Sequence, residues 1–289
     1  MKPAIESKKV KRPGYVEIDP GEWWQLECAP QPRFDTVEIK YDGIWGRVDI
    51  DENRAEIYSR HGQLKTALDI EPVGKTATLH AEYMYGSSWS GRMNLEGVLF
   101  VFDCTSIGGH DISHLPLSRR REAAALMVKK LGEPFRMVKQ FSISKTRELW
   151  EGYIIERNFE GLIFKESDAP FGAKWGRAKR VYEVDYVCLG FNQSDAPKYV
   201  GRMVASVRAG VYANGNLIDV ASVSGLSEHQ RTAMYNNPDD FIGRVFKASG
   251  YQVFKNGALR HPNFVDWHYD KLPQDCTLES VLEIGGWAG

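Results

Sequence analysis

Apolar and polar residues alternate along several short stretches in the first part of the chain. The segment Val37-Glu38-Ile39 alternates in this way, and apolar residues resume at Ile44 after the pair Asp42-Gly43, which is typical of a sharp turn. Residues 45–50, 54–59, 98–103 and 162–165 have similar β-rich compositions. These patterns predict a region of short strands joined by tight connections.

Two stretches among these strands have helical character instead. A helix is expected from Ser118 toward Gly132, because a serine can cap its start and Lys129-Lys130 before a glycine is a common ending. A second helix is expected over residues 144–158. Helices interspersed with short strands predict an α+β domain built around antiparallel sheets.

The pattern changes near Tyr186, after which strand follows strand. Strands are expected at 186–191, 202–212, 217–223 and 244–254, with a hairpin turn at Asn214-Gly215. A capping box of the Ser-x-x-Gln type begins at Ser227 and predicts a short helix to Asn236. This arrangement indicates a small OB-type β-barrel. We therefore expect two domains, residues 1–186 and residues 187–289.

Composition limits the class of protein. The chain has 289 residues and 43% hydrophobic content, which suits one or two domains. No apolar run approaches bilayer-spanning length, and the basic segment 8–12 is not followed by the apolar segment of a signal peptide. The four cysteines are far apart in the sequence, as expected for thiols in a reducing compartment. A cytoplasmic protein without a membrane partner is the expectation.

Nucleic-acid binding by this chain would depend on local clusters of cations, because its formal net charge is −1. Four basic runs are candidates: residues 8–12, 119–121, 129–130 and 177–180. Most such runs are solvated surfaces, and this is the preferred interpretation of the first three.

Lys40 is the strongest candidate for a catalytic group. It follows the strand predicted at 37–39 and begins the sequence Lys-Tyr-Asp-Gly. A lysine amine attacks only when it is deprotonated, and partial burial or cationic neighbours can depress its pKa. The four residues alone are a weak signal, since an ordinary turn with a solvated lysine has the same sequence.

The downstream sequence strengthens the interpretation of Lys40. The K-x-D-G box resembles the first motif of the covalent nucleotidyltransferases, which include ATP-dependent DNA ligases, RNA ligases and mRNA capping enzymes. Further matches follow in the order of that family: Ser59-Arg60-His61-Gly62, Ala81-Glu82, Phe100-Val101-Phe102-Asp103, Glu160-Gly161-Leu162-Ile163-Phe164-Lys165, Trp175-Gly176-Arg177-Ala178-Lys179, Asp185 and Leu259-Arg260-His261-Pro262-Asn263-Phe264.

The resemblance is to the minimal ATP-dependent DNA ligases of phages and bacteria. It implies a nucleotidyltransferase (ATP-grasp-like ligase) domain followed by an OB-fold domain. It also implies that Lys40 attacks ATP to form lysyl-AMP, that AMP passes to the 5′-phosphate of a nick in duplex DNA, and that the 3′-hydroxyl then closes the backbone. Such an enzyme would work as a monomer in DNA repair, replication and recombination.

The same resemblance assigns roles to individual residues. Glu82 and Glu160 would hold either a divalent metal, Mg²⁺ or Mn²⁺, or the ribose. Phe102 would stack on adenine, although an aromatic in an apolar strand is usually plain core. The expected ATP-binding residues are Glu38, Ile39, Arg47, Arg60, Glu82, Phe102, Lys165, Arg177 and Lys179, with supporting roles for Asp42, Arg260, Asp270 and Lys271.

The chain departs from the family pattern in places that leave alternatives open. Trp45 occupies the usual arginine position of K-x-D-G-x-R; either Arg47, on the same strand face, substitutes for that arginine, or Trp45 covers the pocket. His268 stands where the final family motif has arginine, so Lys271 is the better candidate for contacting pyrophosphate. The alternative functions are an RNA ligase, a GTP-using capping enzyme, or a non-catalytic nucleic-acid-binding OB protein.

Overall fold

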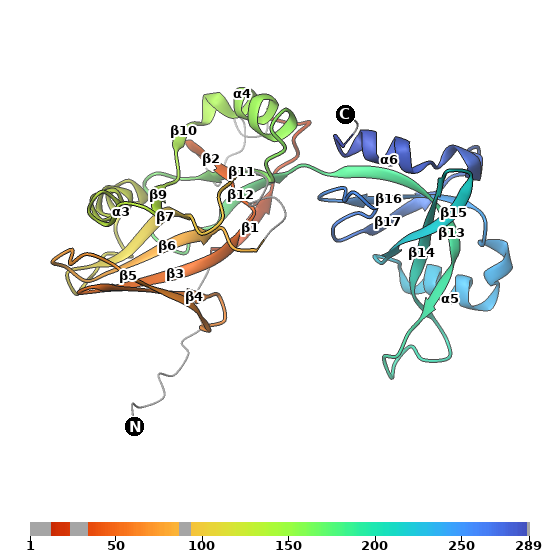
Figure 1. The fold of residues 1–289 in the computed structure, drawn as a ribbon, viewed down its shortest axis with the longest axis horizontal. Coiled ribbons are helices and arrows are strands. Elements are labelled where there is room, and N and C mark those ends of the chain that lie inside the picture. The colour runs from red at the N-terminus through yellow and green to blue at the C-terminus, as the bar shows by residue number, and fades with distance from the viewer. Residues whose placement is uncertain (1–12, 24–33, 87–93, 288–289) are drawn as a thin grey trace. The chain divides into compact units, whose positions relative to one another are not determined.

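The computed structural model describes residues 13–23, 34–86 and 94–287. The chain divides into two compact units, unit 1 (residues 1–180) and unit 2 (residues 181–289), which are described separately (Figure 1). The boundary expected after residue 186 lies inside strand β13 (Tyr182–Gln193). Because β13 pairs along its first half with a strand of unit 2, the whole of it belongs to that unit.

Unit 1 contains a seven-stranded sheet. Its strands follow the order β5-β4-β3-β6-β7-β8, and β9 pairs with β7 in parallel. The bounds are β3 (Ile44–Asp51), β4 (Arg54–Ser59), β5 (Leu64–Asp69), β6 (Ala77–Tyr83), β7 (Leu99–Ile107), β8 (His110–Asp111) and β9 (Phe135–Met137). The strands expected at 45–50, 54–59 and 98–103 are confirmed within this sheet.

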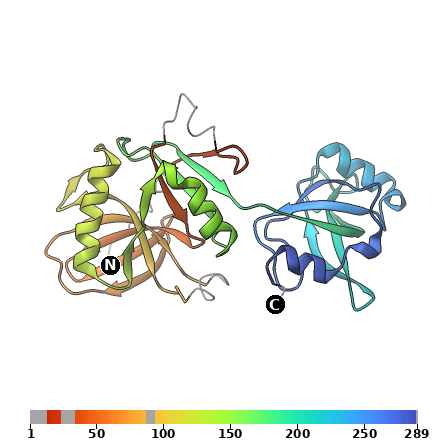
Figure 2. The ribbon, with the colours of Figure 1, turned by 90° about the horizontal axis from the view of Figure 1, so that it is seen from above.

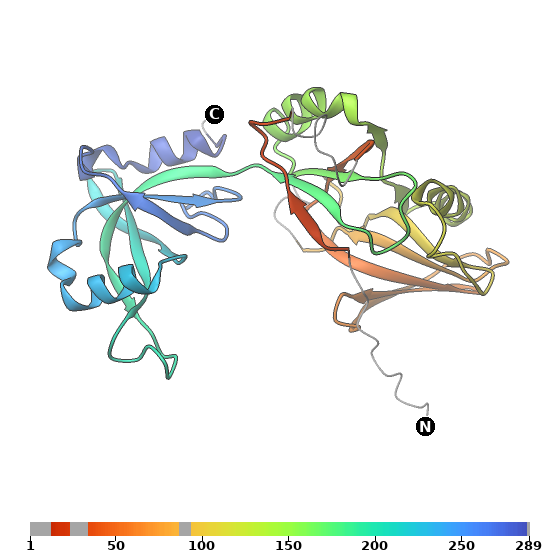
Figure 3. The same ribbon diagram turned by 180° about the vertical axis from the view of Figure 1, so that it is seen from behind.

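A second sheet of unit 1 has five strands in the order β1-β12-β11-β2-β10. The bounds are β1 (Tyr15–Glu17), β2 (Thr36–Lys40), β10 (Gln140–Ser142), β11 (Gly161–Lys165) and β12 (Trp175–Lys179). Pairing is antiparallel except between β1 and β12, which run parallel side by side although they are far apart in sequence (Figure 3). The expectation of antiparallel sheets therefore holds for most pairs, but not for β1–β12 or β7–β9.

Strand β7 separates two cores in unit 1. Leu99 and Val101 point toward helix α3 (Leu117–Leu131), which lies along this face of the sheet (Figure 2). Phe100 and Phe102 point the other way, into a core shared with β2 and β11 of the five-stranded sheet. The period of two thus directs alternate residues of one strand to a helix-covered face and to the space between the sheets.

The two predicted helices form with different regularity. Helix α3 occupies nearly the expected range, but it starts after Pro116 and has no side-chain cap, so the capping role expected for Ser118 is wrong. The second segment is not one regular helix. It is a 3₁₀ turn (Ile143–Lys145), one α-helical turn α4 (Thr146–Leu149) and a π-helical stretch (Trp150–Ile155), which buries Leu149 and Ile154.

Unit 2 is an antiparallel sheet with the strand order β15-β14-β13-β16-β17. The bounds are β14 (Val204–Ala213), β15 (Asn216–Val223), β16 (Val245–Gly250) and β17 (Asn263–Trp267), with helices α5 (Glu228–Asn236) and α6 (Leu278–Ile284) on two different sides of the strands (Figure 2). The capping box of Ser227 and Gln230 is confirmed at the start of α5.

The two edge strands of the sheet in unit 2 approach each other. Asn214 and Gly215 both have positive φ, 50° and 79°, as a tight hairpin requires, and they connect β14 to β15. At the far end of β15, Ser224 forms a parallel bridge to Asn263, and the Phe264 amide donates to the Ser224 carbonyl at 2.7 Å. The edge strands β15 and β17 are therefore hydrogen-bonded to each other at this point.

Candidate active site

Lys40 is the last residue of β2, and the turn after it crosses from one sheet to the other. Strand β2 belongs to the five-stranded sheet and β3 to the seven-stranded sheet, so Asp42-Gly43 is not a hairpin turn. A Cβ on Gly43 would meet the Tyr83 carbonyl oxygen at 2.6 Å, which only glycine avoids. The Gly43 amide donates to Glu82 Oε1 at 3.1 Å. The turn thus brings Lys40 and Glu82 to the same place.

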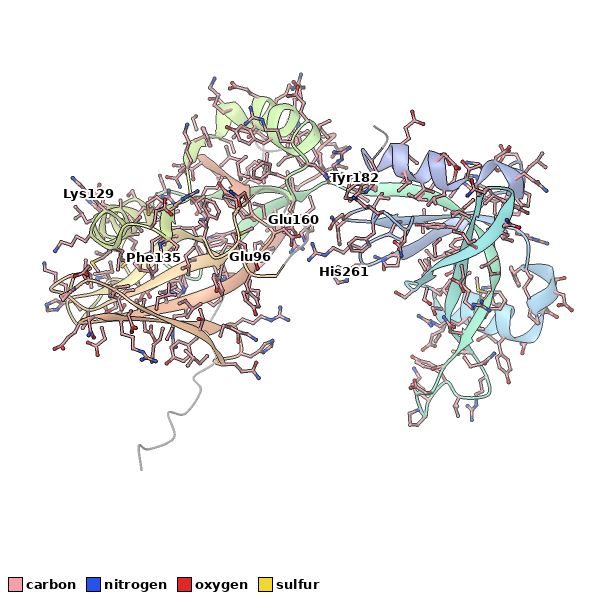
Figure 4. All side chains as sticks on the ribbon, in the orientation of Figure 1. Glu96, Lys129, Phe135, Glu160, Tyr182 and His261 are labelled. Atoms are coloured by element: carbon pink, nitrogen blue, oxygen red, sulfur yellow. The ribbon has the colours of Figure 1, made fainter. Side chains whose placement is uncertain are left out.

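Glu160 joins the ends of three strands around Lys40. Gly161 at the start of β11 lies opposite both Lys40 of β2 and Lys179 of β12. The Glu160 carboxylate consequently accepts a hydrogen bond from Lys40 Nζ and pairs with Lys179 Nζ at 2.6 Å. Glu160 itself is labelled in Figure 4. Glycine is required at 161, because a Cβ there would collide with the Ala178 carbonyl of β12.

The electrostatics of this cluster depend on burial and on the crowding of charges. Burial acts to lower the pKa of Lys40, but Glu160 and Glu82 outweigh it and hold this pKa above its ordinary value. Burial raises the pKa of Glu82 to about 7. Although burial also opposes ionisation of Glu160, Lys40 and Lys179 keep its pKa below the ordinary value. The depressed pKa expected of the Lys40 amine is therefore absent from the nucleotide-free protein.

Lys40 is in the lining of a pocket in unit 1, called the cavity below. Aromatic rings form much of its wall, and the remaining lining combines charged and aliphatic side chains. The lining residues are Tyr15, Glu38, Ile39, Lys40, Tyr41, Trp45, Glu82, Phe102, Val138, Ile163, Lys165 and Trp175. An apolar cavity with a few convergent charged groups is typical of a site for a small ligand.

The inner end of the cavity holds a buried ion network. Lys165 Nζ donates to Glu38 Oε2 at 2.5 Å, and Arg121 donates to Glu38 Oε1 at 2.8 Å. Lys165 is 1% exposed, and burial lowers its pKa against the attraction of Glu38. Its ammonium lies 4.1 Å from the centre of the Trp175 ring. Glu38 and Lys165 thus form one unit of the cavity wall.

The basic run at 119–121 is not the solvated surface that its sequence suggested. Only Arg119 is exposed, where it pairs with Glu122. Arg121 reaches Glu38 of the cavity, and Arg120 is 2% exposed and bound to Asp103 at 2.8 Å. Both side chains are used to join helix α3 to the sheets, so the surface interpretation is wrong for these two residues.

Phe102 is both a core residue and a residue of the cavity lining, the two alternatives that its sequence left open. It is 6% exposed and belongs to the core between the sheets, and it also lines the cavity. Its ring meets Trp175 edge-on at 5.6 Å. Ile39, on the neighbouring β2, lines the cavity beside it.

Trp45 and Arg47 occupy different surroundings on β3. Trp45 is 7% exposed, lines the cavity, and lies 5.3 Å from the His80 ring. Arg47 instead pairs with Asp49 at 2.9 Å and lies over the Tyr58 ring. The position of Trp45 favours its role as a cover of the pocket.

Four of the five expected nucleotide-binding cations are not in the cavity lining: Arg47, Arg60, Arg177 and Lys179. Arg60 is exposed in the turn after β4, where its Nε donates to His61. Arg177 of β12 pairs with Glu17 and lies 4.7 Å from the Tyr15 ring centre. Asp42 lies in the turn next to Lys40 and helps to raise the pKa of Glu82.

The expected residues of unit 2 form a separate group. Lys271 Nζ and His268 Nε2 bind the two oxygens of Asp185 at 2.7 and 2.9 Å. Asp270 is exposed and lies 3.8 Å from the His268 ring. The backbone amide of Arg260 donates to Gln252.

Sequence reasoning assigned no site role to five residues that line the cavity: Tyr15, Tyr41, Val138, Ile163 and Trp175. Tyr41, inside the K-x-D-G box, stacks on Phe100 with ring centres 3.8 Å apart and also meets Phe159 edge-on. Its place in the motif was a signal that could have identified it. Tyr15 lies on a three-residue strand, which is too short to produce a detectable alternation.

Comparisons with known proteins support the resemblance seen in the motifs. Residues 88–182 match the family model "ATP dependent DNA ligase domain". A DNA ligase of Thermococcus onnurineus (strain NA1) is 23% identical over 317 residues, which cover 90% of this chain and 55% of the relative. The chain therefore spans about half the length of this relative.

Solved structures agree on the fold. One described as "DNA binding with a minimal scaffold: Structure-function analysis of Lig E DNA ligases" superposes with a TM-score of 0.62 at 17% identity, covering 90% of this chain and 100% of the other. A second, "Pmar-Lig_Pre.", gives a TM-score of 0.67 at 17% identity over 90% of this chain and 68% of the other. The chain has a ligase-like fold, and the resemblance to the ATP-dependent DNA ligases predicted from its motifs is confirmed.

Proposed function

We propose that this chain is an ATP-dependent DNA ligase that seals nicks between a 5′-phosphate and a 3′-hydroxyl in duplex DNA. The observation that carries the proposal is the position of Lys40, at a strand end beside Glu160 and Glu82 and in the lining of a pocket with aromatic walls. The match of residues 88–182 to the ligase domain model supports the same reaction class.

Lys40 is the nucleophile in this proposal. Because its pKa is raised, the amine is protonated in the nucleotide-free protein and must lose a proton before it attacks. Glu160 accepts a hydrogen bond from Nζ and is in position to receive that proton. Attack on the α-phosphorus of ATP then forms an N–P bond and breaks the P–O bond to pyrophosphate, which leaves lysyl-AMP.

The remaining steps transfer and release AMP. The 5′-phosphate of the nick attacks the lysyl-AMP phosphorus, which restores the lysine and forms a DNA–adenylate. The neighbouring 3′-hydroxyl then attacks the activated 5′-phosphorus and expels AMP. Lys179 and Arg177, which share one face of β12, would stabilise negative charge on the phosphate oxygens, with Lys179 placed at Glu160.

The purine would occupy the aromatic part of the cavity. Phe102, Trp45 and Trp175 supply apolar walls, and Ile39 and Tyr41 lie beside Lys40. At the inner end, the paired side chains of Glu38 and Lys165 present a fixed charged surface. These residues would orient the base so that the α-phosphate faces Lys40.

Glu82 and Glu160 fit a divalent cation. Both carboxylates lie beside Lys40, and burial raises the pKa of Glu82 to about 7, a cost that a cation would offset. Among the residues that the structure describes, no three or more acidic, histidine or cysteine side chains form a metal site, so phosphates and water would supply the other ligands, as Mg²⁺ prefers. Bound Mg²⁺ or Mn²⁺ would neutralise charge on the phosphates.

Unit 2 would be an OB-fold platform for the DNA. The hydrogen-bonded edges β15 and β17, together with a helix between the third and fourth strands, support this assignment. On it, Lys271 and Arg260 would contact phosphates, whereas the exposed Asp270 lies 3.8 Å from the His268 ring. We propose that the protein works as a monomer on nicked DNA.

The test of this proposal is incubation of nucleotide-free protein with α-³²P-ATP or α-³²P-GTP and Mg²⁺, followed by denaturing electrophoresis. Label from ATP alone that is lost in Lys40→Ala is the expected result. Label from GTP would indicate a capping enzyme, and no label from either nucleotide would indicate a non-catalytic protein. Nicked DNA and nicked RNA duplexes of one sequence then distinguish a DNA ligase from an RNA ligase.

A further inference from the structure

Strand β1 (Tyr15–Glu17) is held firmly along the open edge of β12. Its register places Tyr15 beside Trp175 and Glu17 beside Arg177. The Trp175 amide donates to the Gly14 carbonyl and the Ile18 amide donates to the Arg177 carbonyl, both at 2.9 Å. The backbone therefore fixes which residues of β12 the side chains of β1 meet.

Tyr15 forms part of the cavity that contains Lys40. It is one of the lining residues, and its ring meets Trp175, another lining residue, edge-on with centres 6.2 Å apart. The Arg177 guanidinium lies 4.7 Å from the centre of the same ring. Tyr15 thus connects the cavity wall to Arg177.

The Glu17 carboxylate forms an ion pair with the Arg177 guanidinium. It accepts from Arg177 Nε at 3.3 Å and forms a second bond with the terminal nitrogen. Glu17 is 65% exposed, so the pair is weak and open to competition from other anions. A phosphate offers the guanidinium the same two-oxygen geometry with more charge.

The position of Arg177 determines which anion could compete. Trp175, Arg177 and Lys179 alternate along β12 and share a face. Trp175 lines the cavity and Lys179 binds Glu160 next to Lys40. A polyphosphate attached to a base in the cavity would therefore lie near Arg177.

We propose that β1 is part of the nucleotide site. In this proposal the Tyr15 ring contacts the bound nucleotide. Glu17 forms an ion pair with Arg177 that the phosphates of the nucleotide displace. The inference rests on the proposed function, because it takes the ligand of the cavity to be ATP.

Calorimetric binding of α,β-methylene-ATP to the whole protein tests the role of Glu17, since this analogue cannot transfer AMP to Lys40. Glu17→Gln should tighten binding by about two- to fivefold at low salt, as expected when a weak exposed pair is removed, and by less at high salt. Adenosine, which has no phosphate, should bind this variant and the wild type equally. Glu133→Gln is the matched control, because Glu133 is similarly exposed and pairs with Arg136 on the surface.

Tyr15 is tested with the same two ligands. Tyr15→Ala should weaken both by about tenfold, and Tyr15→Phe should restore most of the loss because the ring provides the contact. Tyr85→Ala is the control, since Tyr85 is 60% exposed and is not a lining residue. A thermal melt of each variant shows whether the fold is retained.

The outcomes separate this inference from the proposed function. If the wild type binds α,β-methylene-ATP but Glu17→Gln and Tyr15→Ala match their controls, the role of β1 is overturned and the proposed function stands. If the wild type binds neither ligand, both fail. Tighter binding of adenosine by Glu17→Gln would contradict competition for Arg177.

Discussion

Two sets of buried charges in unit 1, the Asp103–Arg120 pair and the cluster around Lys40, differ in how well the charges are matched. In the structural set, Asp103 binds Arg120 through both oxygens at 2.8 and 2.9 Å, and the guanidinium also donates to the Ala169 carbonyl at 3.0 Å. Both residues are at most 2% exposed. With a further bond to the Leu115 carbonyl, the Arg120 guanidinium makes four hydrogen bonds, the kind of matching that a stable buried pair requires.

The set around Lys40 is less balanced. Two lysines, Lys40 and Lys179, share the carboxylate of Glu160, while Glu82 lies close by with a pKa of about 7. Lys40 is 18% exposed, so a ligand can reach it. The difference indicates that the first set stabilises the fold and that the second is arranged for an incoming charged ligand.

The largest expected effect is on stability, from breaking the matched pair. Arg120→Ala should lower the free energy of unfolding by about 3–5 kcal/mol, because Asp103 is left as a buried charge without its partner. Urea denaturation measures this loss. In Asp103→Leu/Arg120→Met, which removes both charges, most of the stability should return; a double variant as unstable as Arg120→Ala would contradict the explanation.

The corresponding change at the second set should affect chemistry more than stability. Glu160→Gln should reduce the initial rate of labelling by α-³²P-ATP by about 10²–10³, the usual effect of removing one charged group from a catalytic site. Its unfolding free energy should fall by less than that of Arg120→Ala, because Lys40 and Lys179 lose their carboxylate partner but remain 18% and 17% exposed to water. Glu148→Gln, which alters an exposed pair with Lys145, is the control.

The contribution of Glu82 to the free energy of unfolding should depend on pH. Its folded pKa is raised, so protonated Glu82 contributes stability below its unfolded pKa near 4.5, and this contribution is lost as the pH rises through about 7. Without divalent cations, Glu82→Gln should therefore gain up to about 3 kcal/mol over the wild type between pH 5 and pH 8. Denaturation at both pH values measures it, and a constant difference between the proteins would refute the assignment.

The smallest expected effect lies in unit 2. Burial opposes ionisation of Asp185, but Lys271 and His268 hold its pKa below the ordinary value. Because the group is partly exposed, Asp185→Asn should cost only about 0.5 kcal/mol near neutral pH. The difference should shrink as the pH falls below 3.8 and vanish once the pH has passed below the still lower pKa of the folded state, where the wild-type carboxyl is also protonated. A loss of unfolding free energy as large as that of Arg120→Ala would contradict this prediction and would show that Asp185 stabilises the fold as Asp103 does.

Local sequence patterns were sufficient for much of the fold. Strand β4 occupies the range expected from its alternation, and the turn at Asn214-Gly215 and the capping box at Ser227 form as their residues require. Each depends on neighbours within a few residues. The segment at 144–158 was harder, because burial of Leu149 and Ile154 selects an irregular helix that local propensity does not encode.

By itself, the sequence determined the motif residues and their order, the alternation of the strands and the resemblance to ATP-dependent DNA ligases. Only the tertiary structure decided which face of β7 borders the cavity, and that Arg120 and Arg121 are buried. It also decided that Tyr15 joins the site and that Lys40 binds Glu160, which is 120 residues away in the chain. The physical reason is that burial, ion pairing and pKa depend on the register of strands distant in sequence, whereas alternation specifies only that neighbouring side chains point in opposite directions.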